Sequence, residues 1–246
     1  MKASVILPAY NEEGRIGEVI RRVEEALRGA GLDYEIIVVD DGSTDATAAE
    51  VLKYARNSSR VRFVGHSRNL GKGAAVRTGF VHSTGDLVAF IDSDLEVSPE
   101  LLPMYFKALK VADIAIGSKW HPKSRVEVSW IRKLLSRGFY ALVKLLVGVK
   151  VSDTQVGLKA FRREALKKIL RAQLVKRYAF DVELLVIASL LNLKVVEMPV
   201  KVRLKERFRA SEILRMLTDL LGITYRLRVL RWYQKAVTLG HSSPEG

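Results

Sequence analysis

The sequence contains no cysteine, which excludes disulfide bonds and thiolate chemistry. This absence fits a reducing compartment. Asparagine and glutamine are scarce, at four and three residues in a chain that is 28% charged, and this balance hints at a hot environment. No apolar run approaches the roughly 18 residues needed to cross a bilayer. Because residues 1–7 lead directly into a predicted strand, we also expect no signal peptide.

Acidic residues are scarce only in the second half of the chain. Residues 1–125 hold 17 Lys and Arg against 17 Asp and Glu, whereas residues 126–246 hold 24 against 10 and supply the whole net charge of +14. Such a basic half needs an acidic partner: anionic lipid, nucleic acid or a phosphorylated substrate. No nucleic-acid recognition motif is present and acidic strand ends would repel that ligand, so we expect no nucleic-acid partner.

Apolar runs alternate with amphipathic segments in the pattern of an α/β protein. A right-handed β-α-β crossover would set the first two strands side by side and bring Asp40 near residues 8–12. Asn11 is placed to cap the first helix. We predict strands at 3–7, 35–39, 61–65, 87–91, 113–118 and 194–202, and helices at 16–27, 74–84, 100–111 and 129–147.

The strand at 87–91 ends in Asp92, Asp94 and Glu96. Open α/β sheets bind ligands at this end of their strands. In extended backbone, residues two apart point to one side, so these carboxylates could form a row of oxygen ligands for Mg²⁺ or Mn²⁺. The alternative is a solvated acidic loop before a helix that starts at residues 98–100.

A glycine-rich segment at 69–75 follows the third strand. It lacks the P-loop pattern G-x-x-x-x-G-K-[ST]. Its two glycines either bring Lys72 to a diphosphate or form an ordinary tight turn. In the acidic pair after the second strand, we interpret Asp40 as a ligand for a ribose or base edge and Asp41 as a turn-forming residue.

Four segments in this order resemble the successive motifs of the inverting, metal-dependent glycosyltransferases with the GT-A fold. They are 5–12 (VILPAYNE), 38–45 (VVDDGSTD), 68–73 (RNLGKG) and 92–94 (DSD). Segments 152–161 (SDTQVGLKAF) and 180–184 (FDVEL) are similar to the dolichyl-phosphate hexose synthases within that family. The resemblance implies a Rossmann-like nucleotide-binding mixed sheet with helices on both faces over residues 1–210. It also implies transfer of a hexose, with inversion, from a nucleotide sugar to dolichyl or another polyprenyl phosphate.

The same resemblance implies roles for individual residues. It places a Mg²⁺ or Mn²⁺ ion on Asp94 and Glu96, although the family often has Gln where Glu96 stands. Many members carry Arg where Lys119 stands, and lysine lacks the two-pronged grip of a guanidinium on phosphate. The implied catalytic candidates are Asp94, Lys119, Arg132 and Ser136. The implied nucleotide-sugar residues are Pro8, Tyr10, Glu12, Val39, Asp40, Lys72, Asp92, Ser93, Asp94, Arg203, Arg207 and Arg209. The implied acceptor-side residues are Arg132, Ser136, Asp153, Gln155, Asp181 and Glu183.

Two basic segments can also be interpreted from their spacing. On the helix at 129–147, basic and hydroxyl side chains share one face opposite five leucines. This face could cradle an acceptor phosphate, which is already anionic and needs no strong base; the alternative is a solvated stripe. A lysine or arginine stands at every second position from 201 to 209, so extended backbone would line these basic side chains along one face. They would then meet the donor diphosphate or, alternatively, form a basic edge strand that discourages aggregation.

The segment 211–238 combines an apolar arc with basic and aromatic residues. We expect amphipathic helices there that lie on a membrane surface, with a break at Gly222 and a disordered tail over 239–246. Packing on the core or on a second copy is the alternative. We therefore expect a peripheral protein on the cytoplasmic face of a membrane, with a separate membrane-anchoring protein as a further candidate partner.

Two donors fit these motifs. The general pattern favours GDP-mannose on frequency alone. Segments 180–183 and 216–221 instead resemble the glucosyl branch, which uses UDP-glucose. A protein that only binds nucleotide or nucleic acid is the non-enzymatic alternative.

Overall fold

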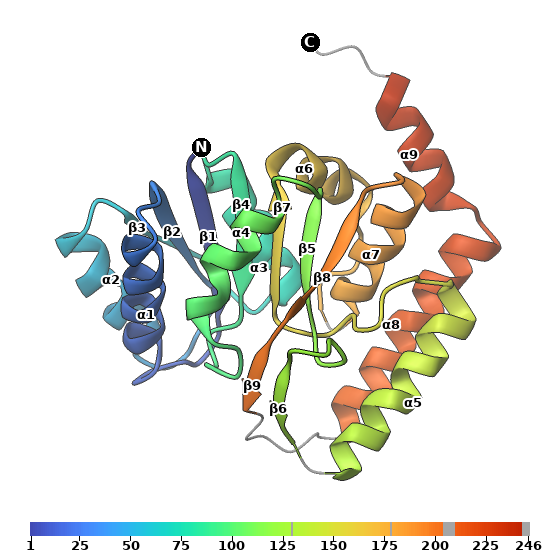
Figure 1. The fold of residues 1–246 in the computed structure, drawn as a ribbon, viewed down its shortest axis with the longest axis horizontal. Helices are drawn as coiled ribbons and strands as arrows, with labels where there is room; N and C mark the ends of the chain where they lie inside the picture. Colours follow the sequence, from blue (N-terminus) through green and yellow to red (C-terminus); the bar gives the residue numbers. More distant parts are fainter. Residues whose placement is uncertain (129, 178, 204–209, 243–246) are drawn as a thin grey trace.

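The computed structural model describes residues 1–128, 130–177, 179–203 and 210–242, with no side chain described at 130–134, 203, 210–213 and 239–242. The strands are β1 (Ala3–Ala9), β2 (Tyr34–Asp40), β3 (Val61–Gly65), β4 (Leu87–Ile91), β5 (Ile114–Ser118), β6 (Arg125–Glu127), β7 (Leu158–Arg162), β8 (Val195–Pro199) and β9 (Lys201–Arg203). Seven of them form a mixed sheet in the order β3-β2-β1-β4-β7-β5-β8, and β6 pairs with β9 below it (Figure 1).

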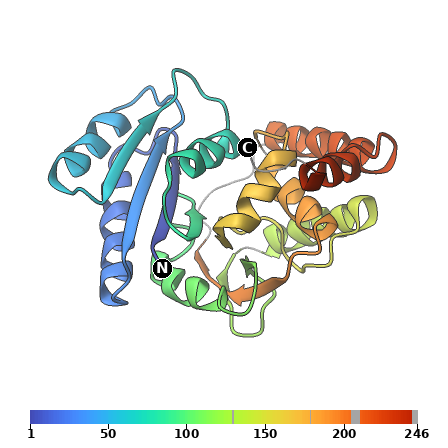
Figure 2. The same cartoon turned by 90° about the horizontal axis from the view of Figure 1, so that it is seen from above.

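Helices cover both faces of the sheet, which confirms the predicted α/β architecture (Figures 1 and 2). One face carries α1 (Ile16–Gly29), α2 (Thr47–Asn57) and, after a 3-10 turn at Pro99–Leu101, α4 (Leu102–Ala108). The other carries α3 (Lys72–His82), α6 (Arg163–Ala172) and α7 (Phe180–Leu190). The helices α5 (Trp130–Val147), α8 (Ala210–Arg228) and α9 (Trp232–Ser242) gather at the end of the molecule opposite β3 and α2.

The amino-terminal half follows the predicted β-α-β order. Strands β1, β2 and β4 are apolar almost throughout because both of their faces are covered. β1 pairs in parallel with β2 and β4, and Ala9 lies opposite Asp40. The carboxyl ends of these strands therefore meet at one edge, as the crossover rule predicts.

β7 is an antiparallel strand that the sequence did not predict. It lies between β4 and β5, with Leu158 opposite Ile91 and Lys159 opposite Ile116. The backbone of Asp92 continues this pairing, because its N–H donates to Gly157 O at 3.1 Å. β7 therefore brings the 152–157 segment beside the acidic end of β4.

Two local predictions were wrong. Asn11 does not cap α1; it has a φ of 56°, and its side-chain oxygen accepts a hydrogen bond from Thr44 N at 2.9 Å. The strand predicted at 194–202 is broken after Pro199, since Val200 N donates to the Ser124 hydroxyl at 2.9 Å instead of continuing the ladder. The chain then pairs with β6 as β9.

The carboxyl-terminal helices also differ from their prediction. α8 runs through Gly222, where we expected a break, because one glycine costs a helix only about 1 kcal/mol and Leu220 and Ile223 are fully buried. The turn comes instead near Arg231, which has a φ of 50°. α9 continues to Ser242, past the point where we expected the ordered chain to end, and residues 243–246 lie outside the described part.

Candidate active site

A cleft of about 400 Å³ lies at the edge where the parallel strands end. This is where open α/β sheets bind their ligands. The cleft brings together seven of the predicted nucleotide-sugar residues, two of the predicted acceptor-side residues and five further residues. Its lining consists of Pro8, Ala9, Tyr10, Glu12, Asp41, Asn69, Gly71, Lys72, Asp92, Ser93, Asp94, Gln155, Arg177 and Asp181.

Two predicted nucleotide-sugar residues stand behind the cleft wall. Val39 is fully buried in the core on the α3 side of the sheet. Asp40 is 5% exposed, and its Oδ1 accepts hydrogen bonds from the backbone N–H and the hydroxyl of Ser43. Neither lines the cleft as predicted, because Asp40 uses its carboxylate to shape the turn after β2.

Asp41 does more than form a turn. Its carboxylate accepts hydrogen bonds from Leu70 N at 2.9 Å and Gly71 N at 2.7 Å, and contacts His66 Nδ1 at 2.7 Å. Gly71 has a φ of 101°, and a Cβ there would lie 2.4 Å from Lys176 O, so only glycine fits. Asp41 and Gly71 thus fix segment 69–72, called here the donor loop. We did not single out His66 from the sequence.

The donor loop presents Lys72 to the cleft. Its Nζ lies 2.7 Å from Asp92 Oδ1 and 3.5 Å from Asp181 Oδ2, and 5.4 Å from the ring centre of Phe90. Burial disfavours the charged amine, but Asp181 and Asp92 outweigh that effect and raise the pKa of Lys72. Lys72 is therefore a fixed cation in the floor of the cleft.

A second lysine lies below this one. Lys159 is fully buried, and its Nζ donates to Asp181 Oδ1 at 2.7 Å and Val156 O at 2.8 Å. Burial lowers the pKa of Lys159, while Lys159 and Lys72 overcome the opposite effect of burial on Asp181 and lower the pKa of that carboxyl. Ion pairs thus run from Asp92 to Lys72, from Lys72 to Asp181 and from Asp181 to Lys159, so the network contains two cationic and two anionic side chains.

The acidic row after β4 is not extended throughout. Ser93 donates its hydroxyl to Pro8 O at 2.8 Å, and Glu96 N donates to Asp94 Oδ1 at 2.8 Å. Leu95 has a φ of 59°, so the chain turns between Asp94 and Glu96 instead of alternating as we predicted. Both carboxylates nevertheless line one small cavity that adjoins the cleft.

These acidic residues fit an ion shared with a substrate. Among the described residues, no three His, Cys, Asp or Glu side chains are arranged to hold a metal by themselves. Asp94 and Glu96 offer two carboxylates at one cavity. Mg²⁺ and similar ions commonly bind one or two carboxylates and take further ligands from substrate phosphates. The donor set therefore fits a divalent ion that arrives with, or is completed by, a diphosphate.

Lys119 and Gln155 line the same small cavity. Asp153, which is 4% exposed, braces both: its Oδ2 lies 3.2 Å from Lys119 Nζ, and its Oδ1 accepts from Gln155 N at 3.0 Å. Asp153, which we predicted on the acceptor side, thus supports two residues of the small cavity without lining it. Ser136 lies on α5 and lines neither cavity. The side chains of Arg132 and Arg203 and the whole of Arg207 and Arg209 lie outside the described residues.

Glu183, which we predicted on the acceptor side, lines neither the cleft nor the small cavity. It is fully buried, and it accepts hydrogen bonds from Leu174 N, Val175 N and the hydroxyl of Tyr233. Asp181 and Glu183 are two residues apart on a helix, so their side chains point in different directions. The helical spacing of these two residues was therefore the signal in the sequence that Asp181 and Glu183 face different surroundings.

The sequence and the fold both match known proteins. The family model described as "Glycosyl transferase family 2" matches residues 4–170. A dolichyl-phosphate beta-glucosyltransferase of Trichomonas vaginalis is 36% identical over 244 residues, which cover 92% of this chain and 74% of that protein. The dolichyl-phosphate beta-glucosyltransferase of Homo sapiens is 36% identical over 213 residues, covering 80% of this chain and 66% of its own length.

Among solved structures, glucosyl-3-phosphoglycerate synthase from Mycobacterium tuberculosis in complex with UDP matches with a TM-score of 0.70 and 25% identity. The match covers 91% of this chain and 79% of that one. The same synthase in complex with Mn²⁺, UDP and glucosyl-3-phosphoglycerate matches with a TM-score of 0.69 at 24% identity, which shows a shared fold.

Proposed function

Because the chain belongs to glycosyl transferase family 2, as its motifs predicted, we propose that it transfers glucose from UDP-glucose to the phosphate of dolichol or another polyprenol. The observation that carries this proposal is the cleft, where motif residues from β1, the donor loop and the end of β4 meet beside Asp94 and Glu96. The relatives named above are glucosyltransferases. They favour the alternative donor, UDP-glucose, over our initial preference for GDP-mannose.

The donor would lie along the cleft, with its base and ribose toward Tyr10 and Glu12 and its diphosphate toward Lys72. Asp94 and Glu96 would hold a divalent ion, which supplies positive charge to the departing UDP. The mycobacterial synthase of the same fold has been solved with Mn²⁺ and UDP. Lys72 adds a second, fixed cation, which stabilises negative charge as it develops on the leaving group.

The acceptor would enter through the small cavity beside Lys119 and Gln155. Its phosphate is already an anion, so the chain needs to position and desolvate it rather than remove a proton. Attack by a phosphate oxygen on the face of the sugar opposite the departing UDP inverts the anomeric carbon. Arg132 and Ser136, in the first two turns of α5, stay our predicted contacts for the lipid phosphate.

Donor choice tests this function directly. With dolichyl phosphate and Mn²⁺ or Mg²⁺, we expect kcat/KM for UDP-glucose to exceed that for GDP-mannose by about a hundredfold, since one pocket is fitted to one base and one sugar. Calorimetric titration with UDP and with GDP, each with and without Mn²⁺, separates binding from chemistry. Preference for GDP-mannose would restore the mannosyl alternative. Binding of neither nucleotide would favour the non-enzymatic alternative.

The helices α5 and α8 supply a surface for the lipid end of the acceptor. The Arg228 side chain donates to Leu146 O at 2.7 Å and Leu145 O at 2.9 Å, which joins the two helices. Large apolar side chains stay exposed on this pair: Leu145, Leu214 and Leu221 are 73%, 67% and 61% exposed. In the part of the chain that the structure describes, no helix is long and apolar enough to span a bilayer. We propose that α5 and α8 rest on the membrane. The cytoplasmic side of the membrane as their location, and a separate anchoring protein as a further partner, stay predictions.

Vesicle binding checks this surface. Replacing Leu214 and Leu221 with Glu is expected to weaken flotation with anionic liposomes by about tenfold, because each change removes an apolar contact and adds repulsion. Leu52→Glu, on α2 at the other end of the molecule, is the matched control and should float like the wild type. Equal flotation of all three proteins would argue for core packing or self-association of these helices.

A further inference from the structure

Glu183 is a buried carboxylate that the proposed reaction does not use. One oxygen, Oε2, accepts hydrogen bonds from Leu174 N at 3.0 Å and Val175 N at 2.7 Å. The other accepts from the hydroxyl of Tyr233 on α9, and that hydroxyl also accepts from Arg226 Nε at 3.0 Å. Burial raises the pKa of Glu183 despite these donors. A carboxylate is costly to bury unless it is fully hydrogen-bonded, so this one needs its three donors.

Leu174 and Val175, which Glu183 holds, begin a short segment, 174–177, that supports the donor loop. Lys176 O accepts a hydrogen bond from Gly73 N at 2.8 Å, and Arg177 donates to Asn69 O at 3.2 Å. The fit is tight, since a Cβ on Gly71 would lie 2.4 Å from Lys176 O and one on Gly73 would lie 2.9 Å from Val175 O. Segment 174–177 therefore packs against the donor loop at Asn69 and Gly71, and against Gly73 directly after it, and so fixes the position of the loop at the cleft.

Together these contacts connect α9 to Lys72 in three steps: Tyr233 to Glu183, Glu183 to segment 174–177, and that segment to the donor loop. We propose that Glu183 and Tyr233 are positioning residues, which hold the donor loop in the position that binding of the donor diphosphate requires. The inference rests on the proposed function for the identity of that ligand. It makes nucleotide binding depend on α9, a helix from which no described side chain lines the cleft.

The geometry explains why a tyrosine and a carboxylate are used. Hydrogen bonds to an ionised group are shorter and stronger than neutral ones. Arg226 adds a positive charge on the Tyr233 side, because its Nη2 lies 4.0 Å from Oε1 of Glu183, the oxygen that accepts from Tyr233. Loss of the Tyr233 hydroxyl would leave one carboxylate oxygen short of a donor, and Glu183 could then shift away from Leu174 and Val175.

Amide hydrogen exchange of the donor loop measures the link between Tyr233 and that loop without any ligand. In Tyr233→Phe, we expect amides of residues 69–75 to exchange about tenfold faster than in the wild type, in line with the loss of one hydrogen bond to a charged group. Tyr105→Phe is the matched control, because Tyr105 is also fully buried and its hydroxyl also makes a hydrogen bond, to Pro199 O at 3.3 Å. The control should leave residues 69–75 unchanged, and equal exchange in Tyr233→Phe and the wild type overturns the proposal.

Calorimetric titration with UDP in the presence of Mn²⁺ measures the expected effect on nucleotide affinity. We expect Tyr233→Phe to bind UDP about threefold to tenfold more weakly, whereas Tyr105→Phe binds as the wild type does. Glu183→Gln keeps an acceptor for Leu174 and Val175, so it should retain more UDP affinity than Glu183→Ala at equal folded fraction. Unchanged UDP affinity in Tyr233→Phe would contradict the inference. If the wild type itself bound no UDP while the exchange difference held, the proposed donor would fail and the positioning role would stand.

Discussion

Asp94→Asn is expected to lower turnover by about three orders of magnitude while the protein stays folded. Asp94 lines both the cleft and the adjoining small cavity, where it is one of two carboxylates that would carry the divalent ion. Asparagine keeps the side-chain oxygen that accepts from Glu96 N at 2.8 Å, so the turn at Leu95 can persist. Only the negative charge is lost. Initial rates at saturating UDP-glucose and dolichyl phosphate, over a range of Mn²⁺ concentrations, measure the effect.

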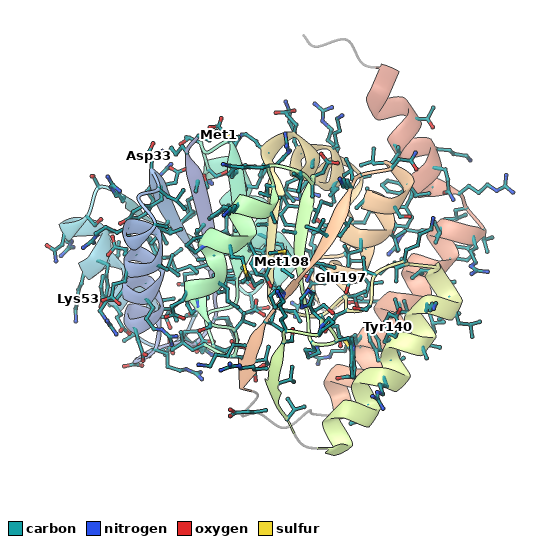
Figure 3. All side chains as sticks on the ribbon, viewed as in Figure 1. Met1, Asp33, Lys53, Tyr140, Glu197 and Met198 are labelled. Atoms are coloured by element: carbon teal, nitrogen blue, oxygen red, sulfur yellow. The ribbon has the colours of Figure 1, made fainter. Side chains whose placement is uncertain are left out.

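The control for this variant is Asp33→Asn. Asp33 is exposed and directly precedes β2, whereas the cleft lies where the parallel strands end; Figure 3 labels Asp33 at the same end of the molecule as Met1. Its replacement should leave both turnover and the melting temperature unchanged. Near-native, metal-dependent turnover in Asp94→Asn would remove Asp94 from the site and, with it, the proposed place of the ion.

The sequence was most informative where strands are buried on both faces. The predicted strand at 87–91 matches β4 residue for residue, and all five of its residues are buried. Such strands read as continuous apolar runs bounded by polar or glycine residues. The carboxyl ends of such strands meet at one edge of the sheet, where ligands bind. That Pro8, Lys72 and Asp94 belong to one nucleotide-sugar site was implied by the family resemblance, and all three line the cleft.

β7 escaped prediction because its sequence, LKAFR, carries no readable period. Lys159 is buried at the centre of the sheet only because Asp181 meets it from α7, 22 positions later in the chain. Such a pairing is long-range, and local patterns hold no trace of it. The same limit applies to Glu183, whose partner Tyr233 lies 50 positions away. The helical spacing of Asp181 and Glu183 could have separated their directions, but not named their partners.

The amphipathic helices were predicted in position but not in environment. Of the five leucines expected on the apolar face of α5, Leu135 and Leu145 are 46% and 73% exposed and Leu142 and Leu146 are partly buried, while the side chain of Leu134 lies outside the described residues. A hydrophobic stripe indicates that a helix face needs cover, yet it does not say whether protein or lipid supplies that cover. The exposed leucines beside α8 are why the membrane surface stays the proposal for this end of the molecule.

Removal of the buried lysine should have the largest effect on stability. Lys159→Met is expected to lower the free energy of unfolding by about 3–5 kcal/mol, the usual cost of leaving one partner of a buried ion pair alone. Asp181 would keep only Lys72, at 3.5 Å, and Val156 O would lose its hydrogen bond. Urea denaturation measures the change. Lys168→Met, on the exposed side of α6, is the matched control and should stay within about 0.5 kcal/mol of the wild type.

The double variant Lys159→Met/Asp181→Leu separates charge from packing. If the uncompensated carboxylate causes the loss, removing it as well should recover stability, so the double variant should be more stable than the sum of the two single changes predicts. Strict additivity would mean that the cavity and the unpaired Val156 carbonyl dominate instead. The two outcomes also differ at the cleft. In Lys159→Met, Asp181 would draw Lys72 away from Asp92 and weaken donor binding, whereas the double variant would leave Lys72 paired with Asp92 alone.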